Sequence, residues 1–201
     1  MRRVVITGLG TVNALGPDVK TSWPRMLAGE NGVGPLTTIE SEDLAVRFAA
    51  SVDWDPKERF NGPDFRKLDP FTMFALKSAE EALLDAGLNP DDASEEERER
   101  WGAIIGTGIG GITGIVETHL VLLDRGPRRV SPHFIPRIMA NAVSGQVAIA
   151  NKLLGTAFTT SSACASAGHA IGMALQSVRY GESDVILTGG AESATTRLSI
   201  A

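Results

Sequence analysis

The sequence predicts an α/β fold with a largely parallel sheet, because short apolar strands alternate with helical segments along the chain. The chain has 201 residues, of which 43% are hydrophobic. This length suits one large domain or one half of a bigger protein. Three apolar runs, at 102–106, 158–161 and 185–188, end at glycines or small polar residues, as buried parallel strands do.

The first part of the chain is expected to contribute one strand and one helix. Val4–Thr7 is a short apolar run that stops at a glycine, and it predicts a further buried strand. Asp18 is suited to cap a helix through Leu27, with Gly29 ending it. Residues 30 to 65 are interrupted by glycine and proline, and only 46–52 in this region suggests a strand.

The clearest helix begins at Asp69-Pro70, carries apolar residues on one face and ends at Gly87. The charged run 95–100 reads as a solvated helical face or loop. A helix is expected around 115–123, followed by a basic, proline-broken loop over 125–136. A single helix is then expected from about 136 to 154.

Charge and cysteine content exclude several classes of protein. The formal net charge of −5 argues against general nucleic-acid binding. The chain has one cysteine, which rules out an internal disulfide and disfavours a cysteine-based zinc site. No run of about 20 apolar residues is present to cross a membrane, and the apolar run at the N-terminus is too short for a signal sequence. We therefore expect a cytoplasmic protein.

Cys164 is placed where a strand is expected to turn into a helix, within the run Thr159–His169. The unpaired N–H groups of a helix N-terminus can stabilise a thiolate or an oxyanion formed on an acylated sulfur. The following helix has small residues on nearly every face, so it is expected to be buried between two layers, with the thiol opening into a cavity. The residues alone leave open whether Cys164 is a nucleophile or a small buried hydrophobe.

No histidine of the sequence is an evident base for this thiol. His169 is five residues further along the expected helix, a rotation of about 140°, so the two side chains should leave different faces. His119 and His133 have no neighbouring pattern that marks a base. Cys164 is therefore expected to lack a catalytic partner within this chain.

Six ordered motifs are spread over the whole chain: Arg2–Gly10, Arg66–Phe71, Gly106–Gly111, Gly126–Phe134, Ser161–Ser166 and Gly189–Glu192. Together they resemble the motifs of the β-ketoacyl-acyl carrier protein synthases, most closely the elongating type II condensing enzymes of fatty acid synthesis.

The resemblance implies a thiolase-like layered fold, of which residues 1–201 form the N-terminal half. It implies a decarboxylative Claisen condensation that lengthens an acyl chain by two carbons. Cys164 would be the acylated nucleophile, with its own N–H in the oxyanion hole. No dissociable cofactor is expected, since acyl groups arrive on the phosphopantetheine of acyl carrier protein, and the full-length enzyme is expected to be a homodimer.

The resemblance also assigns roles to residues away from the cysteine. Ile109 matches a position that lines the acyl pocket, and Phe134 an aromatic position near the pocket and the dimer partner. The residues that match positions for docking the acidic carrier protein are Arg66, Lys67, Arg128 and Arg129. The family's two catalytic histidines and supporting lysine lie in its second half, so this chain alone is expected not to condense substrates and to expose apolar surface.

Three alternatives remain beside this interpretation. Gly106-x-Gly108-x-x-Gly111 matches a dinucleotide-binding fingerprint, with Asp124 as the acidic residue that would follow, although no clear strand ends there. A thiolase or a polyketide-type ketosynthase is a second possibility. A non-catalytic chain-length partner is the third, and the presence of Cys164 argues against it.

Overall fold

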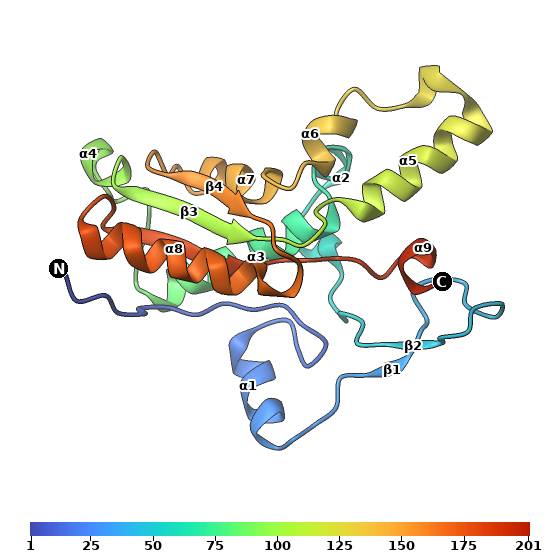
Figure 1. Cartoon of the computed structure of the whole chain (residues 1–201), viewed down its shortest axis with the longest axis horizontal. Helices are drawn as coiled ribbons and strands as arrows, with labels where there is room; N and C mark the ends of the chain where they lie inside the picture. The colour runs from blue at the N-terminus through green and yellow to red at the C-terminus, as the bar shows by residue number, and fades with distance from the viewer.

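The computed structural model describes residues 1–201 and is built around a three-stranded parallel sheet (Figure 1). The central strand β3 (Trp101–Gly106) pairs with β4 (Ala157–Thr160) on one side and β5 (Val185–Gly190) on the other. In this register Ile104 lies between Phe158 and Thr188. All three strands were predicted, and the α/β fold with a parallel sheet is confirmed.

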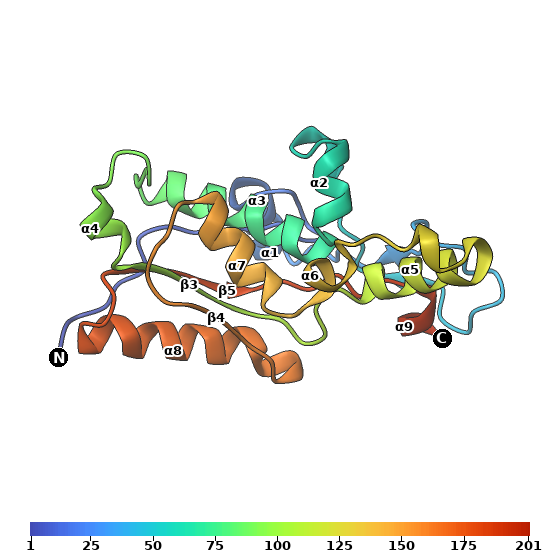
Figure 2. The ribbon, with the colours of Figure 1, turned by 90° about the horizontal axis from the view of Figure 1, so that it is seen from above.

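Helices cover both faces of the sheet, as Figure 2 shows. On one face lie α3 (Pro70–Asp85) and α7 (Ala142–Ala150), and on the other lies α8 (Ser166–Tyr180). The main core fills the space between α3, α7 and the sheet. Its fully buried side chains include Phe71, Met73, Val143 and Val147. The apolar face predicted for the helix after Asp69 is therefore the face that forms this core.

Helix α8 is buried on one side only, which corrects the expectation of a helix enclosed between two layers. Ser166, Ala170 and Ala174 are buried against the sheet. Ile171 and Met173 on the outer face are exposed, because no element of these 201 residues packs against that face. The small residues of α8 thus allow close packing on the sheet, and its other side is open.

The predicted N-terminal strand is absent. Residues 1–10 form no strand, and Val5 and Ile6 are 60% and 82% exposed. The segment lies along α3 instead: a Cβ on Gly8 or Gly10 would meet the carbonyl oxygens of Ala82 or Ser78, at 2.1 and 1.9 Å. The prediction was wrong because a strand needs a neighbouring strand, and none is hydrogen-bonded here.

The next segment forms α1 (Val19–Leu27), capped as predicted by Asp18, whose Oδ1 accepts from Thr21 N at 2.7 Å. A small antiparallel pair follows, β1 (Gly34–Pro35) with β2 (Phe48–Ala49). The strand expected over 46–52 is thus reduced to two residues.

Short helices complete this part of the chain. They are the 3₁₀ helix η1 (Pro56–Glu58), α2 (Gly62–Lys67) and α4 (Glu95–Arg98). The charged run at 95–100 therefore begins as a helix, and a capping box between Ser94 and Glu97 stabilises the N-terminus of this helix.

The region after β3 contains α5 (Ile112–Arg125), the 3₁₀ helix η2 (Pro127–Arg129) and α6 (Phe134–Ile138). The single helix predicted from 136 to 154 is wrong: α6 ends at Ile138, and α7 begins only at Ala142. The break has a tertiary cause, since the Ile138 carbonyl accepts from Gly111 N at 3.1 Å rather than from the next helical turn.

The chain closes with α9 (Arg197–Ile200), which lies beside the β1–β2 region (Figure 1). Arg197 forms a two-point ion pair with Asp43, at 2.7 and 2.9 Å, and its Nη1 also donates to the Glu40 carbonyl. None of the helices combines the length and hydrophobicity needed to span a bilayer.

Candidate active site

The only cysteine lies in a tight turn directly after β4. Ala163 has φ of +50°, in the left-handed region that a residue with a side chain rarely adopts. The 3₁₀ helix η3 (Ala163–Ala165) follows, and α8 begins at Ser166. Cys164 is exposed. The strand–turn–helix setting is as predicted, but the thiol opens to the surface of this chain because the outer side of α8 is uncovered.

Ser166 holds this turn through its hydroxyl group. Its Oγ accepts from Ser162 N at 2.8 Å and donates to the Ala163 carbonyl at 2.7 Å. Thr160 Oγ1 donates to the Ser166 carbonyl at 2.8 Å, which joins the end of β4 to the start of α8. The strained backbone at Ala163 is thus fixed by a side chain that is itself buried.

Glycines at the ends of β3 and β5 allow the sheet to pack closely against the turn that carries Cys164. A Cβ on Gly106, at the end of β3, would lie 2.3 Å from the carbonyl carbon of Ser166. A Cβ on Gly190, at the end of β5, would lie 2.6 Å from the Cβ of Ala167. Only glycine permits this contact, so the N-terminus of α8 rests directly on the ends of two strands.

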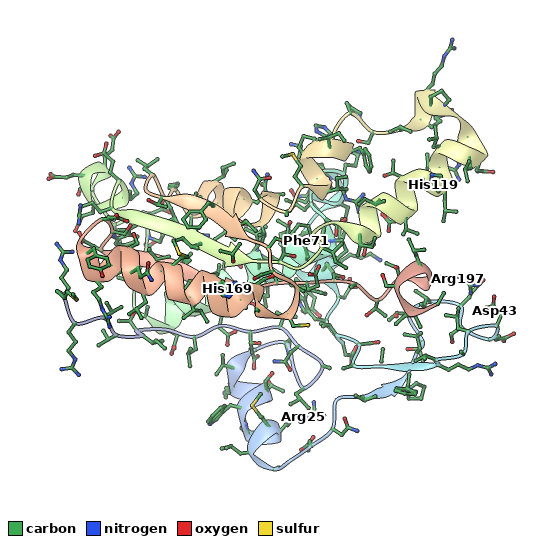
Figure 3. The ribbon with its side chains drawn as sticks, in the orientation of Figure 1. Arg25, Asp43, Phe71, His119, His169 and Arg197 are labelled. Atoms are coloured by element: carbon green, nitrogen blue, oxygen red, sulfur yellow. The ribbon has the colours of Figure 1, made fainter.

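None of the three histidines is hydrogen-bonded to the Cys164 thiol. His169 Nδ1 lies 2.6 Å from Ser162 Oγ, on the first turns of α8. Figure 3 shows His119 on α5, far from His169. His133 precedes α6 and is exposed. The absence of a catalytic partner for Cys164 within the chain stays a prediction.

The glycine-rich loop after β3 lies against the turn of the cysteine. Ser161 Oγ donates to the Gly108 carbonyl at 3.2 Å, and a Cβ on Gly108 would lie 3.6 Å from Ala163 Cα. Glu192, just after β5, binds the same loop: its Oε2 accepts from Gly108 N at 2.6 Å and from Ile109 N at 3.0 Å. Glu192 belongs to the motif Gly189–Glu192, but the sequence alone predicted no role for it.

The two expected pocket residues lie on neighbouring elements. Ile109 is 55% exposed in the loop, and Phe134 is half-buried at the start of α6. The loop after β3 packs closely on α6 at Gly111, where a Cβ would lie 2.5 Å from Ile138 Cα. Neither Ile109 nor Phe134 lines the large cavity of about 870 Å³ between α5, residues 38–52 and residues 191–201.

The four expected docking residues are exposed and belong to no ion pair. Arg66 and Lys67 form the last turn of α2, and Arg128 and Arg129 lie in η2. Figure 1 shows α2 near α6 and the body of the molecule, whereas η2 lies at the far end of α5. The structure therefore places them as two separate pairs of free cations.

A buried carboxylate at the N-cap of α3 contacts the first turn of α5. Asp69 follows Lys67 and Leu68 and is fully buried, and its Oδ2 accepts from Gly114 N at 2.8 Å. Arg137 Nε lies 3.7 Å from the same oxygen. Burial raises the pKa of Asp69 to about 6, although the Gly114 N–H and Arg137 act in the opposite direction.

The whole chain, residues 1–201, matches the sequence profile of the beta-ketoacyl synthase N-terminal domain. The chain belongs to the beta-ketoacyl synthase family. It is 42% identical over its full length to 3-oxoacyl-[acyl-carrier-protein] synthase 2 of Rhizobium meliloti (strain 1021). It is 38% identical to the enzyme of the same name from Staphylococcus aureus (strain COL). The resemblance inferred from the motifs is thereby confirmed.

The chain spans about half the length of these curated relatives, 49% and 48%. Among solved structures, the ishigamide ketosynthase/chain length factor matches with a TM-score of 0.88 and 29% identity, over 98% of this chain and 49% of that one. The fold of this beta-ketoacyl synthase domain is therefore that of known ketosynthases.

The dinucleotide-binding alternative does not agree with the structure. The N–H groups of Gly108 and Ile109, which a phosphate would need, donate to Glu192. Asp124 lies in the last turn of α5, pairs with Arg125 and follows no strand. The glycines of the beta-ketoacyl synthase loop instead allow close packing on Ala163 and Ile138.

Proposed function

We propose that Cys164 accepts an acyl group from a carrier-bound thioester, the first step of a 3-oxoacyl-acyl carrier protein synthase. The observation that carries the proposal is the position of this exposed thiol in a strained strand–turn–helix junction of a beta-ketoacyl synthase domain. The names of the relatives support this substrate class.

The transfer is a thioester exchange. The Cys164 thiolate attacks the acyl carbonyl, and a tetrahedral oxyanion forms as the carbonyl π bond opens. The carbon–sulfur bond to the carrier's thiol then breaks, and that thiol leaves as a thiolate that takes up a proton. Cys164 is the second residue of η3, where a main-chain N–H has no intrahelical acceptor and is free to donate to the oxyanion.

Condensation itself is proposed for the whole protein. A malonyl thioester would lose CO₂, and the resulting carbanion would attack the acyl-Cys164 carbonyl and release the cysteine thiolate. Decarboxylation and carbanion stabilisation need hydrogen-bond donors or a base beside the sulfur. His169 is hydrogen-bonded to Ser162, and no histidine is hydrogen-bonded to the thiol, so we assign only acylation to the residues of this chain.

The exposed, unpaired cations of α2 and η2 support docking of an acidic acyl carrier protein. Arg66 and Lys67 precede the buried Asp69 by three and two residues, and this N-cap of α3 is hydrogen-bonded to Gly114 at the base of α5. We further propose a cytoplasmic homodimer for the whole protein, without a dissociable cofactor, on the strength of the family alone.

The test is acyl transfer from acyl carrier protein to this chain, measured as release of the carrier's free thiol. Wild type is expected to release one thiol per chain and Cys164→Ala none. Because the chain has one cysteine, no other thiol contributes. Release that is equal in both proteins would refute the proposal.

Docking is tested with the same assay. Arg66→Glu with Lys67→Glu should slow transfer from the carrier at least about tenfold, with little change for a small acyl thioester that lacks the carrier. Arg128→Glu with Arg129→Glu tests the second pair. If transfer from both donors slowed equally, the substitutions would be disturbing the surroundings of the Cys164 thiol and not the docking of the carrier.

A polyketide-type ketosynthase is a second candidate, favoured by the match to the ishigamide ketosynthase/chain length factor. It shares the acylation of Cys164 and differs in the acyl groups accepted. Preference for a saturated over a polyunsaturated or β-keto acyl donor separates the two.

A further inference from the structure

The carboxylate of Glu192 organises most of the loop that follows β3. Its Oε2 accepts three hydrogen bonds, from Gly108 N at 2.6 Å, Ile109 N at 3.0 Å and Thr107 Oγ1 at 3.2 Å. Thr107 Oγ1 in turn accepts from Gly110 N at 3.2 Å. Four consecutive residues of the loop, 107–110, are therefore bound, directly or through one hydroxyl group, to one side chain 82 to 85 residues further along the chain.

The negative charge of the Glu192 carboxylate is stabilised by these hydrogen-bond donors and by no positively charged side chain. Glu192 takes part in none of the ion pairs of the structure. Two successive main-chain N–H groups directed at one anionic oxygen form a nest, and hydrogen bonds to a charged acceptor are stronger than neutral ones. All hydrogen bonds that the Glu192 side chain forms are therefore with the loop.

Backbone hydrogen bonds from Thr107 N and Gly111 N hold the two ends of the loop, and Glu192 holds the glycine-rich stretch between them. Gly108 and Gly110 lack side chains, and Gly110 has φ of +85°. A Cβ on Gly108 would lie 2.9 Å from Glu192 Oε2, so the carboxylate occupies the space that a side chain would fill. The position of Ile109, between these glycines, consequently depends on the carboxylate.

The same loop borders the nucleophile. Ser161 Oγ donates to the Gly108 carbonyl, and Gly108 faces Ala163, the residue before Cys164. A shift of the loop would therefore move the Ile109 side chain relative to any acyl group on the sulfur. Its direct effect would be on the space next to Cys164 and not on the thiol itself.

We infer that Glu192 is a positioning residue that fixes the loop of residues 107–110, including Ile109, against the turn of Cys164 and so sets which acyl chain lengths the cysteine accepts. The inference rests on the proposed acylation of Cys164. It gives the Glu192 carboxylate a role in selecting the acyl substrate through the loop, without contact with the reacting atoms.

The test compares acylation of Cys164 by butyryl and palmitoyl donors in this chain. Glu192→Ala should change the ratio of the two rates at least about threefold. Glu192→Gln should keep a ratio near that of wild type, because its amide oxygen can still accept from both N–H groups. Alkylation by iodoacetamide, which reports only on access to the thiol, should change less than about twofold. Glu182→Ala, an exposed glutamate in no ion pair, is the matched control.

A double-mutant cycle separates positioning from a general structural effect. Ile109→Ala should change the ratio by itself, and adding Glu192→Ala to it should then have little further effect. Additive changes, or an unchanged ratio in Glu192→Ala, would overturn the inference.

Amide hydrogen exchange gives a measure that does not depend on acylation. Glu192→Ala should accelerate exchange at Gly108 and Ile109 at least about tenfold, with exchange in β3 unchanged. If wild type is not acylated at all, the proposed function fails. The role of Glu192 in holding the loop is then decided by this exchange experiment, and unchanged exchange would overturn it.

Discussion

The turn that carries Cys164 and the arm formed by α5 and η2 are held by different kinds of contact. In the turn, glycines place strand ends directly against the start of α8, and the buried hydroxyl group of Ser166 holds the strained residue Ala163. The arm packs mainly on α6 and is hydrogen-bonded near its base to Asp69 and Ser193, and it exposes Leu120 and Leu123 at 60% and 70%. The turn is therefore tightly packed, whereas much of the arm is open to solvent.

The largest expected effect comes from disturbing the packing under the turn. Gly106→Ala should destabilise the chain by at least about 3 kcal/mol, because the new Cβ would overlap the backbone of Ser166 and neither main chain can give way. The measurement is the free energy of unfolding in urea. Gly168→Ala is the matched control, since a Cβ there meets nothing within 4 Å and should stabilise α8 by about 0.5–1 kcal/mol. Equal effects of the two substitutions would show that the turn is not tightly packed.

Asp69 lies where the arm joins the body, and its titration offers the next largest effect. Because burial raises its pKa to about 6 from 3.8, the folded chain favours the protonated carboxyl. The stability that this contributes is complete below pH 4 and is lost as the pH rises through 6. Relative to Asp69→Asn, wild type should therefore lose roughly 2–3 kcal/mol of unfolding free energy between pH 4 and pH 7. Parallel pH profiles of the two proteins would contradict this explanation.

Substitutions on the arm should have the smallest effect on stability. Leu123→Gln should change the free energy of unfolding by less than about 0.5 kcal/mol, because the side chain is mostly exposed. It should at the same time reduce self-association of the chain, measured by light scattering, since it interrupts an apolar surface. A large loss of stability would mean that the arm packs more firmly than its contacts indicate.

Local patterns were sufficient to predict the sheet and much of the site. The strands at 102–106, 158–161 and 185–188 are short apolar runs with glycine or small residues at their ends, and both features are readable in the sequence. The turn at Cys164 was found for the same reason, because a strand that runs into small residues and then a helix places the cysteine at the junction.

The features missed by the sequence depend on contacts between distant residues. Val4–Thr7 has the composition of a strand but no neighbour to pair with. The helix break after Ile138 follows from the hydrogen bond to Gly111, and the role of Glu192 follows from N–H groups more than 80 residues away. Periodicity within one segment cannot reveal such contacts.

The central claim, that Cys164 accepts an acyl group, is tested most directly by mapping the adduct. After incubation with an acyl carrier protein donor, mass spectrometry of the digested chain should find one acyl group on the peptide that contains Cys164, and hydroxylamine should remove it as it removes a thioester. An unmodified Cys164 peptide, or an adduct that resists hydroxylamine and lies on another residue, would contradict the account.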